Sequence, residues 1–581
     1  MPRFSNQHVA KLFADIGDLL EIKGENRFKV LAYRNAADHI ENLSFDLYDY
    51  WESGSDLRQI EGIGQAISEK IDEKFKTGKL GFWDKLAAEI PPALVEVLAI
   101  PDVGPKMAKA MWEQLGITTV AEVKAAAQEG KLQNLPRMGA KSAARILASI
   151  EAVERRETGR VHLGVAWPLA MQIVAALKEL PEVLYIEPAG SLRRMRETIG
   201  DLDIVVATEK PAPIMAAFKK LPLAAEVLLT GETKTSLRLS NGMQADLRCV
   251  TPQQWGAALQ YFTGNKNHNV KIRELAQRKG YSLNEYALTR ESDGEPLFFA
   301  DEAALYEFFG LPYIPPYLRE DRGEIEAAFK NGLPAGLAAS DIKGEVHCHS
   351  TWSDGRNSVE EMARAALAKG YQYLAITDHS QSLGVASGLS AERLAQQRRE
   401  IDEVQSRVPA IRLWQGSEVE VRADGMLDFP DEVLAQLDYV VASVHTGLRQ
   451  DRDTLTRRAL AAIRNPYVKQ LAHPTGRLLP RREGGDFDLE ALIQAAAETG
   501  TFLEINASPE RLDLPDTHVR RAIELGVRLI INCDAHHVDD LNNLHFGVAT
   551  ACRGWASTEN VVNTRPPEEF VGLWKKRGNM S

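Results

Sequence analysis

Two aspartates separated by a single residue could hold metal ions for phosphoryl transfer. Asp201 and Asp203 open a β-branched run, and alternate side chains of an extended strand point to one side, so both carboxylates aim at one spot. A divalent cation that also binds substrate phosphates is the usual partner of adjacent carboxylates. Asp246 supplies the third carboxylate expected from a neighbouring strand. The sequence therefore predicts a two-metal site, where one ion activates an attacking 3′-hydroxyl and the other stabilises a leaving pyrophosphate.

Phosphate-binding groups precede these aspartates. Ser191 and the backbone N–H groups around Gly190 can hold terminal phosphates, and Arg194 can act as a charge-assisted clamp. An Asp-x-Asp pair alone is weak evidence of catalysis. With Gly-Ser-x-x-Arg before it and Asp-x-Arg at 246–248 after it, the set resembles the nucleotidyltransferase superfamily.

Histidines and carboxylates recur beside short apolar strands in the C-terminal part of the chain. The segments 374–376, 439–441 and 529–531 alternate with Ala-rich helices, which predicts a β/α barrel whose strand ends meet on one rim. Ligands that mix imidazole and carboxylate suit Zn²⁺, Mn²⁺ or Fe²⁺. The candidate ligands are His347, His349, Asp354, His379, Glu418, His445, His473, Asp534 and His536.

Three glycine turns within the first 155 residues each precede a helix that carries Ala and Lys. Such a turn presents free N–H groups to phosphate oxygens, and the contact reads no base sequence. The turns resemble helix-hairpin-helix DNA-binding motifs, with ordinary helix–helix turns as the alternative. Asp102 and Arg137 replace the first glycine in the second and third copies, so the first copy matches best, and Gly64 is expected to need a glycine conformation. The glycines assigned to DNA binding are Gly62, Gly64, Gly104 and Gly139.

The segment 261–273 resembles the signature of family X DNA polymerases, and 284–286 follows as it does there. Without this segment an untemplated nucleotidyltransferase would be the alternative; its presence favours templated DNA synthesis. Asn265 stands where the family usually has serine. The resemblance implies that Tyr261 and Phe262 flank the sugar of the incoming nucleotide. It also implies that Gly264 and Asn269 contact the nucleotide, with Asn269 at the minor-groove edge of the base. Arg248 and Arg273 are then implied to contact DNA.

The segments 29–34 and 62–73 resemble the lyase domain of DNA polymerase beta. The resemblance implies that Lys70 forms a Schiff base with an abasic-site sugar and that Lys29 and Tyr33 belong to a 5′-phosphate pocket. Ala66 replaces a pocket lysine, which weakens the phosphate contact and the cationic activation of the nucleophile. Binding of gap ends is expected, while lyase chemistry and a plain surface lysine stay open as alternatives.

The C-terminal ligands resemble the metal set of the polymerase and histidinol phosphatase (PHP) domain. The resemblance implies three ions, Zn²⁺ and/or Mn²⁺, with a bridging hydroxide that attacks a phosphodiester. Asp378 is expected to orient a ligand histidine. A 3′→5′ exonuclease, an abasic-site endonuclease and a 3′-phosphatase stay open. The implied groups are His347, His349, Glu418 and Asp534 for one ion, His445 and His473 with bridging Glu418 for another, and Asp354, His379 and His536 for the third.

The composition is that of a folded chain of several domains. The 581 residues are 44% hydrophobic and 26% charged, which excludes wholesale disorder. No long apolar run or signal peptide is seen, and four scattered cysteines form no disulfide framework, so we expect a cytoplasmic protein without membrane contact. The net charge of −12 argues against a protein whose whole surface binds nucleic acid, although metal sites also concentrate carboxylates.

The expected fold is multidomain, with an all-α helix-hairpin-helix N-terminal region, an α/β nucleotidyltransferase palm with a thumb, and a C-terminal β/α barrel of the PHP type. The expected boundaries are 1–85 for a lyase-like domain, 86–158 for fingers with helix-hairpin-helix motifs, 159–255 for the palm, 256–320 for the thumb, 321–340 for a linker and 341–581 for the PHP domain.

The sequence is thus identified as a member of the bacterial family X DNA polymerases with a PHP domain. This implies a monomer that fills short gaps during DNA repair, using gapped or primer–template DNA, deoxynucleoside triphosphates and Mg²⁺ or Mn²⁺, with 3′–5′ exonuclease activity in the barrel. One alternative is a DNA-end-binding scaffold whose only activity is a PHP phosphoesterase. A second is a small-molecule phosphoesterase joined to an inactive nucleotidyltransferase that only scaffolds DNA, and a third is a non-catalytic DNA-end-binding module.

Overall fold

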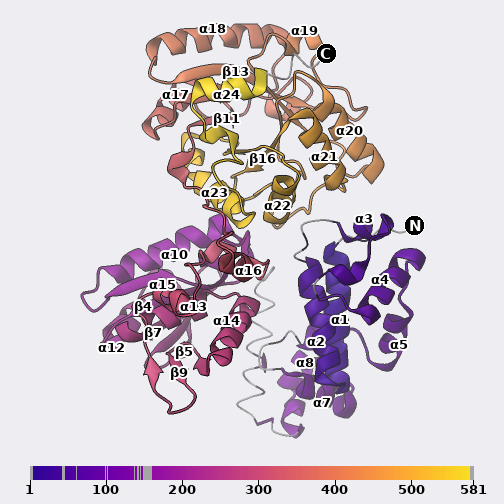
Figure 1. Ribbon diagram of the computed structural model, residues 1–581, viewed down its shortest axis with the longest axis vertical. Coiled ribbons are helices and arrows are strands. Elements are labelled where there is room, and N and C mark those ends of the chain that lie inside the picture. Colours follow the sequence, from indigo (N-terminus) through magenta and orange to yellow (C-terminus); the bar gives the residue numbers. More distant parts are fainter. Residues whose placement is uncertain are drawn as a thin grey trace. The chain divides into compact units, whose positions relative to one another are not determined.

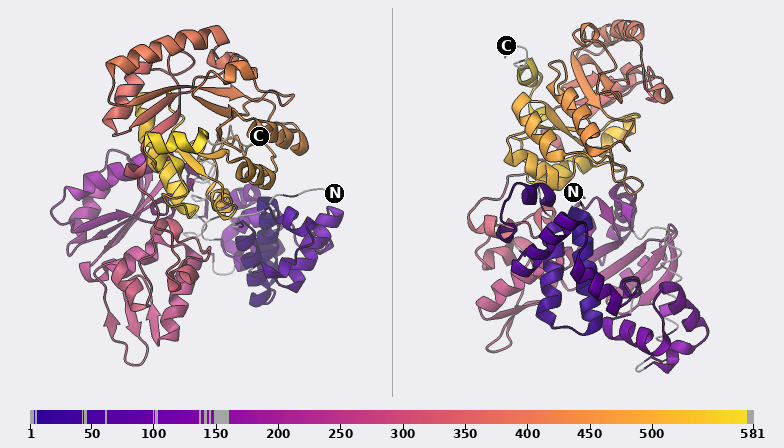
Figure 2. Two further views of the ribbon diagram at one scale, coloured as in Figure 1. Left: turned by 45° about the horizontal axis from the view of Figure 1, so that its top comes forward. Right: turned by 90° about the vertical axis from the view of Figure 1, so that its right-hand side faces the viewer.

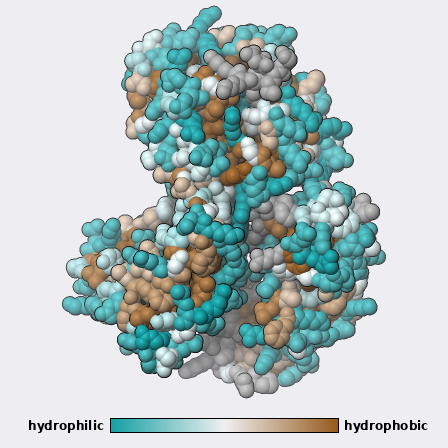
Figure 3. Space-filling model, viewed as in Figure 1, coloured by the Kyte–Doolittle hydropathy of each residue, from teal (hydrophilic) through white to brown (hydrophobic). Residues whose placement is uncertain are grey.

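A computed structural model describes residues 4, 6–41, 43, 46–60, 62–98, 100, 103–135, 138, 139, 143, 146, 147 and 160–575. It divides into two compact units, residues 1–159 and residues 160–581. Among the described residues, no helix combines the length and the apolar character needed to cross a membrane. On the face shown in Figure 3, hydrophilic residues dominate and hydrophobic ones are interspersed among them.

The first unit is helical throughout its described part (Figure 1). Apolar side chains such as Phe13, Phe75 and Leu94 are fully buried between the helices. Gly78 and Gly116 end two of the helices in the left-handed conformation that glycine favours. The helices are α1 (Asn6–Lys23), α2 (Arg27–Glu41), α3 (Leu47–Glu52), α4 (Gln65–Thr77), α5 (Gly81–Glu89), α6 (Leu94–Leu98), α7 (Pro105–Leu115) and α8 (Val120–Gln128).

The second unit begins with a five-stranded sheet in the order β2-β4-β7-β6-β5, here called the palm sheet. Its strands are β2 (Tyr185–Pro188), β4 (Asp201–Ala207), β5 (Ala224–Thr230), β6 (Lys234–Leu239) and β7 (Gln244–Val250). The surrounding elements are β1 (Val161–His162), α10 (Leu163–Lys178), α11 (Gly190–Arg193), β3 (Thr198–Ile199), α12 (Pro211–Phe218) and α13 (Trp255–Thr263).

Alternation along β4 divides its side chains between the two faces of the palm sheet. Leu202 and Ile204 pack in one apolar cluster with Ile173 of α10 and Phe218 of α12. Val205 belongs to a second cluster, which includes residues of α13. Asp201 and Asp203 therefore share the α13 face, as the sequence predicts.

A small antiparallel sheet in the order β10-β9-β8 follows the palm sheet. The range 321–340, expected to be a linker, contains helix α16, whose Ile325 and Ala328 are buried in the apolar cluster of this part. The elements are α14 (Lys266–Arg278), β8 (Tyr281–Leu283), β9 (Leu288–Arg290), β10 (Pro296–Leu297), α15 (Glu302–Phe308) and α16 (Glu324–Phe329).

The C-terminal part is a parallel sheet of seven strands in sequence order, β11 to β17, with helices outside it (Figures 1 and 2). A parallel bridge between Cys348 and Ala535 joins the first strand to the segment after the last. The β/α barrel is thus confirmed, and the structure shows that its sheet has seven strands. The strands are β11 (Gly344–Cys348), β12 (Tyr373–Ile376), β13 (Arg412–Glu420), β14 (Tyr439–Ser443), β15 (Gln470–Leu471), β16 (Phe502–Asn506) and β17 (Leu529–Asn532).

The last helix of the barrel, α24 (Pro567–Lys575), covers the end at which the strands begin. Phe570 stacks on Tyr373, the first residue of β12, with ring centroids 4.9 Å apart, and Trp574 contacts Tyr439, the first residue of β14. The opposite rim, where the strands end, is left for polar groups. The barrel helices are α17 (Val359–Ala368), α18 (Ala391–Arg407), α19 (Asp431–Leu434), α20 (Arg452–Arg464), α21 (Leu489–Thr499), α22 (Asp516–Glu524), α23 (Leu544–Arg553) and α24 (Pro567–Lys575).

Candidate functional site

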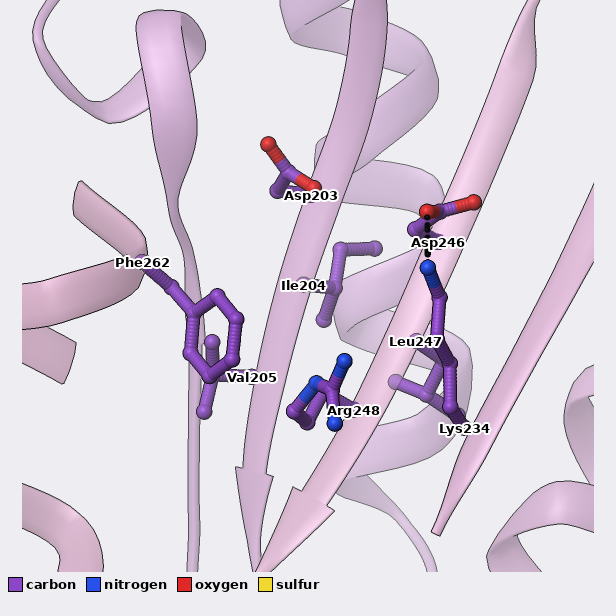
Figure 4. A pocket seen from close by; sticks show the side chains of 8 residues that line it. All are labelled: Asp203, Ile204, Val205, Lys234, Asp246, Leu247, Arg248 and Phe262. Atoms are coloured by element: carbon purple, nitrogen blue, oxygen red, sulfur yellow. Dashed lines mark ion pairs between the residues drawn. The ribbon is translucent and has the colours of Figure 1, made fainter. Parts of the chain in front are cut away.

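The three predicted carboxylates of the palm sheet lie on two adjacent parallel strands. Asp203 of β4 is directly opposite Asp246 of β7 in the register, and Asp201 lies two residues before Asp203. Burial raises the pKa of Asp203 to about 7, with further contributions from the negative charges of Asp201 and Asp246. Figure 4 shows the carboxylates of Asp203 and Asp246 side by side on their strands. Such crowding of negative charge favours binding of a divalent cation.

A lysine that the sequence analysis missed accompanies these carboxylates. The Nζ of Lys234, on the neighbouring strand β6, lies 3.1 Å from Oδ2 of Asp246 (Figure 4). Gln244 donates a hydrogen bond of 2.9 Å to the other oxygen of Asp246. Lys234 thus places a cationic group beside the carboxylates. No spacing rule relates it to Asp246; only the pairing of β6 with β7 brings the two together.

The turn before β4 places the predicted phosphate-binding residues next to Asp203. Gly190 has φ of +56°, and a Cβ at this position would lie 2.3 Å from Oδ2 of Asp203, so only glycine fits. Ser191 follows it in α11. Arg194 donates from Nε to Oε1 of Glu320 at 3.0 Å and from Nη1 to the carbonyl oxygen of Thr263.

The predicted nucleotide-binding and DNA-binding residues of α13 and α14 gather near the same turn. Phe262 contacts the guanidinium group of Arg248, whose carbon lies 4.9 Å from the ring centroid. Asn269 donates to the carbonyl oxygen of Tyr261 at 2.8 Å. A Cβ on Gly264 would lie 3.2 Å from Nη1 of Arg194. Arg273 is exposed on α14, one turn after Asn269.

Eight of the nine predicted ligands of the barrel fall into three overlapping groups on one rim, and within each group the ligand atoms lie within 4.8 Å of one another. Most of them follow the end of a strand, whereas His347 lies inside β11 and Glu418 inside β13. His473, expected to join His445, hydrogen-bonds Oε1 of Glu418 through Nε2 at 3.0 Å. The groups are His347, His349, Glu418 and Asp534; His379, Glu418 and His445; and His349, Asp354, His379 and His536.

Unsatisfied atoms show that this donor set fits metal ions. Nε2 of His347, Nδ1 of His349, Nδ1 of His473 and Oε2 of Glu418 are buried and have no hydrogen-bond partner among the described residues. Burial, together with the charges of His536 and His379, lowers the pKa of His349 to about 3, so its imidazole is neutral. Burial alone would raise the pKa of Glu418, but the surrounding histidines hold it well below its usual range. Neutral imidazoles and an ionised carboxylate are the forms that bind metal.

Two buried carboxylates that the sequence analysis missed fix the ligand histidines. Glu504 of β16 accepts a hydrogen bond of 2.7 Å from Nδ1 of His347, and its other oxygen accepts from the backbone N–H of His473. Glu420 of β13 lies 2.9 Å from Nδ1 of His445. A carboxylate on Nδ1 directs the Nε2 lone pair of the imidazole towards a metal.

Asp378 does not orient a ligand histidine through a hydrogen bond, contrary to the prediction. Its carboxylate accepts hydrogen bonds from the N–H and hydroxyl groups of Ser350 and from Nε2 of Gln397. Asp378 therefore fixes the backbone that follows His349, because Ser350 is the next residue. Glu504 and Glu420 perform the role that the sequence analysis assigned to Asp378.

The three residues predicted for the lyase pocket surround one aromatic ring in the first unit. The ring of Phe82 stacks on Tyr33 at 5.7 Å, and Nζ of Lys29 and of Lys70 lie 5.6 Å and 5.0 Å from its centroid. Lys70 also donates to the carbonyl oxygen of Ala66 at 3.0 Å. Two ammonium groups beside an aromatic face suit a phosphate, and one of them, that of Lys29, also pairs with Glu25 at 3.3 Å.

The hairpin glycines precede helices as predicted, but the glycine that needs a positive φ is Gly62 and not Gly64. Gly64 and Gly104 are the N-caps of α4 and α7 with negative φ and no atom within 4 Å of a Cβ. Gly62 instead has φ of +81°, and its Cβ would lie 2.4 Å from the ring of His39. The expectation that Gly64 needs a glycine conformation is therefore wrong. Gly139 is described, whereas Asp102 and Arg137 lie outside the described residues.

Four protein-family models match the chain. They are described as a helix-hairpin-helix domain at residues 4–80, a SAM-like helix-hairpin-helix tandem at 94–152, a DNA polymerase beta thumb at 258–320 and a PHP domain at 345–508. These models place a polymerase element immediately after the palm sheet and a PHP domain over the barrel.

Curated relatives agree with these models. The chain is 39% identical over 571 residues to a DNA polymerase/3′-5′ exonuclease PolX of Bacillus subtilis (strain 168), covering 98% of this chain and 99% of the relative. It is 28% identical over 232 residues to a probable phosphatase of Thermoanaerobacter sp. (strain X514), covering 38% of this chain and 89% of the relative. A probable phosphatase of Caldicellulosiruptor bescii is 29% identical over 252 residues, covering 41% and 97% respectively.

Proposed function

This chain belongs to the bacterial family X DNA polymerases that carry a C-terminal PHP domain, and we propose that it fills short gaps during DNA repair. It is a DNA-directed DNA polymerase with 3′–5′ exonuclease activity. Its substrates are DNA and deoxynucleoside triphosphates, and gapped or primer–template DNA is the form that we propose. The observation that carries this proposal is the register of Asp203 with Asp246 beside the glycine turn at Gly190.

In the palm sheet, Asp201, Asp203 and Asp246 would hold the divalent ions. Mg²⁺ or Mn²⁺ bound there would lower the pKa of the attacking 3′-hydroxyl and neutralise charge on the phosphates. Ser191 and Arg194 would orient the terminal phosphates, because a hydroxyl and a guanidinium both donate to anionic oxygens.

The remaining residues of this site would select the substrate. Tyr261 and Phe262 would pack against the sugar, and Asn269 would contact the base. Arg273 is exposed, with a hydrogen bond of 3.4 Å from Nε to the carbonyl oxygen of Asn269, and its guanidinium would contact a DNA strand. In the first unit, the 5′-phosphate of a gap would be bound by Lys29, Tyr33 and Lys70. The hairpin glycines would contact the DNA backbone. Lys70 is also the residue that would act in a lyase reaction.

In the barrel, the nine clustered ligands would hold Zn²⁺ or Mn²⁺ ions that activate water for hydrolysis of a phosphodiester. The protein contributes the imidazoles of His347 and His445, which Glu504 and Glu420 orient. It also supplies Glu418, which is shared between two of the groups. A scaffold with only phosphoesterase activity is not favoured, because all three palm carboxylates are present and aligned.

Two variants assayed on the same DNA separate the two activities. Asp203→Asn is expected to abolish gap filling and to leave nuclease activity intact, whereas His349→Ala is expected to do the reverse. Each variant serves as the control for the folding of the other. Incorporation of nucleotides by Asp203→Asn at the wild-type rate would contradict the proposed polymerase site.

A further inference from the structure

A buried network of charges joins the barrel to the turn that carries Arg194. Arg553, the last residue of α23, and Asp516, the first residue of α22, belong to the barrel. Glu320 follows the β8–β10 sheet and is 6% exposed, and Arg553 is 5% exposed. Buried charges are tolerated only when they are paired and hydrogen-bonded, so each contact in this network has a defined geometry.

One carboxylate oxygen is shared between two arginines. Oε1 of Glu320 accepts from Nε of Arg194 at 3.0 Å and from Nη1 of Arg553 at 2.9 Å. Arg553 also donates from Nη1 to the carbonyl oxygen of Arg194 at 2.6 Å. A residue of the barrel thus contacts both the backbone of Arg194 and the carboxylate that binds its side chain.

Asp516 completes the attachment of Arg553. Its Oδ2 lies 2.7 Å from Nη2 of Arg553 and 3.1 Å from Nη1 of Arg322. Arg196 approaches the second oxygen of Glu320 at 3.7 Å. The network therefore contains four guanidinium groups and two carboxylates. The excess of positive charge is suited to a region in which a polyphosphate is expected to bind.

We propose that Arg553 of the barrel positions Arg194 for the incoming nucleotide by sharing Glu320 with it. This inference rests on the proposed polymerase function. Without Arg553, the only other guanidinium group within 4 Å of Glu320 among the described residues would be that of Arg196 at 3.7 Å, so Glu320 would compete more strongly with the nucleotide phosphates for the guanidinium group of Arg194. The carbonyl oxygen of Arg194 would also lose its donor, and the turn would lose an anchor. Arg553 is a positioning residue, because it acts through Glu320 and the backbone of Arg194.

The network gives the barrel a second role beyond its own metal site. A contact that only held the barrel against the turn of Arg194 would change the stability of the protein. A contact that positions Arg194 changes the affinity for the nucleotide. The two roles are distinguished by comparing KM for the nucleotide with kcat. A second ion pair between the barrel and the palm region also distinguishes the two roles. If the contact were only stabilising, removing that other pair would change KM as much as removing Arg553 does. Glu197 and Arg477 form such a pair at 2.8 Å, without touching Arg194 or Glu320.

The experiment is single-nucleotide gap filling by the full chain carrying Arg553→Met, which keeps an unbranched apolar stem and removes the guanidinium group. We expect KM for the deoxynucleoside triphosphate to rise about tenfold, equivalent to ~1.4 kcal/mol of binding. We expect kcat, affinity for gapped DNA, nuclease activity and barrel metal content to stay at wild-type values. Glu197→Gln, the matched interface control, should leave KM unchanged.

A double-mutant cycle tests whether the effect passes through Glu320. In the Glu320→Gln background, Arg553→Met should raise KM much less than in the wild type, because the shared carboxylate is gone. Equal effects in the two backgrounds would overturn the proposal, as would an unchanged KM in Arg553→Met or an equal rise in Glu197→Gln.

Two further outcomes are separable. If Arg553→Met loses nuclease activity as well, its barrel is disturbed, and the Asp516→Asn variant is measured instead. A rise in the KM for the nucleotide in Asp516→Asn supports the proposal, and an unchanged KM overturns it. A wild-type chain that incorporates no nucleotide contradicts the polymerase function itself. A wild-type chain that incorporates normally while its Arg553→Met variant shows an unchanged KM contradicts only the role of Arg553.

Discussion

Replacing Gly190 by alanine should remove most polymerase activity through a single steric contact. The φ of Gly190 is +56°, and the new Cβ would lie 2.3 Å from Oδ2 of Asp203. The left-handed conformation costs an L-residue about 1–2 kcal/mol. The short contact adds a second effect, because the carboxylate of Asp203 must move away from its place opposite Asp246.

The size of the effect follows from the geometry. Restoring an ordinary contact distance moves the carboxylate by about 1 Å, and a misplacement of that size costs roughly 100-fold in rate, or ~2.7 kcal/mol of transition-state stabilisation. Nuclease activity should be unchanged, because the barrel ligands lie on other strands. Gap-filling kcat/KM measured beside nuclease activity on the same preparation tests both expectations.

Gly242 provides the matched control. Its φ is +87°, and no atom lies within 4 Å of the position of a Cβ. Gly242→Ala therefore carries the conformational cost without the clash, and its gap filling should stay within about threefold of wild type. If Gly190→Ala and Gly242→Ala had the same kcat/KM, the contact with Asp203 would be irrelevant and the reasoning refuted.

Three further predictions concern metals and the hairpins. Glu418→Ala should lose more barrel metal than Asp354→Ala, because Glu418 belongs to two ligand groups and Asp354 to one; elemental analysis after dialysis measures this, and equal losses would argue against a bridging role. Burial and two neighbouring carboxylates raise the pKa of Asp203 to about 7, so protons compete with the palm metal. Affinity for Mn²⁺ should be higher about one unit above that pKa than one unit below it, and calorimetry showing no change would count against the assignment. The raised pKa also means that, without metal, ionised Asp203 destabilises the fold as pH rises through 7. Gly62→Ala should lower the melting temperature of the first unit more than Gly64→Ala, because only Gly62 has a positive φ; the reverse order would disprove it.

The positions of the barrel carboxylates explain why the ligand histidines are held so rigidly. Glu504 receives hydrogen bonds from His347, from the backbone of His473, and from the side chains of Gln470 and Asn532. These donors come from β11, β15, β17 and the segment after β15. A single buried carboxylate therefore ties four parts of the rim together before any ion binds.

Local patterns in the sequence were enough for the features that depend on one strand or one turn. The alternation of Asp201 and Asp203 with apolar neighbours predicted which face of β4 they share. The His-x-His spacing at 347 and 349, at the end of β11, predicted two ligands on one rim. Short apolar segments between Ala-rich helices predicted the parallel barrel. In each case the information lies within a few residues, because strand geometry repeats every two residues.

Only the tertiary structure decided which distant groups meet. The pairing of Asp203 with Asp246, the approach of Lys234 and the contact of Glu504 with His347 each depend on strand order and register. A buried carboxylate has no local signature, since its partners come from strands far away in the sequence. The contact of Arg553 with Glu320 likewise joins residues 233 positions apart. Sequence determined the chemical groups and their faces, whereas packing determined their partners, because burial makes every polar group depend on whichever donor or acceptor the fold brings to it.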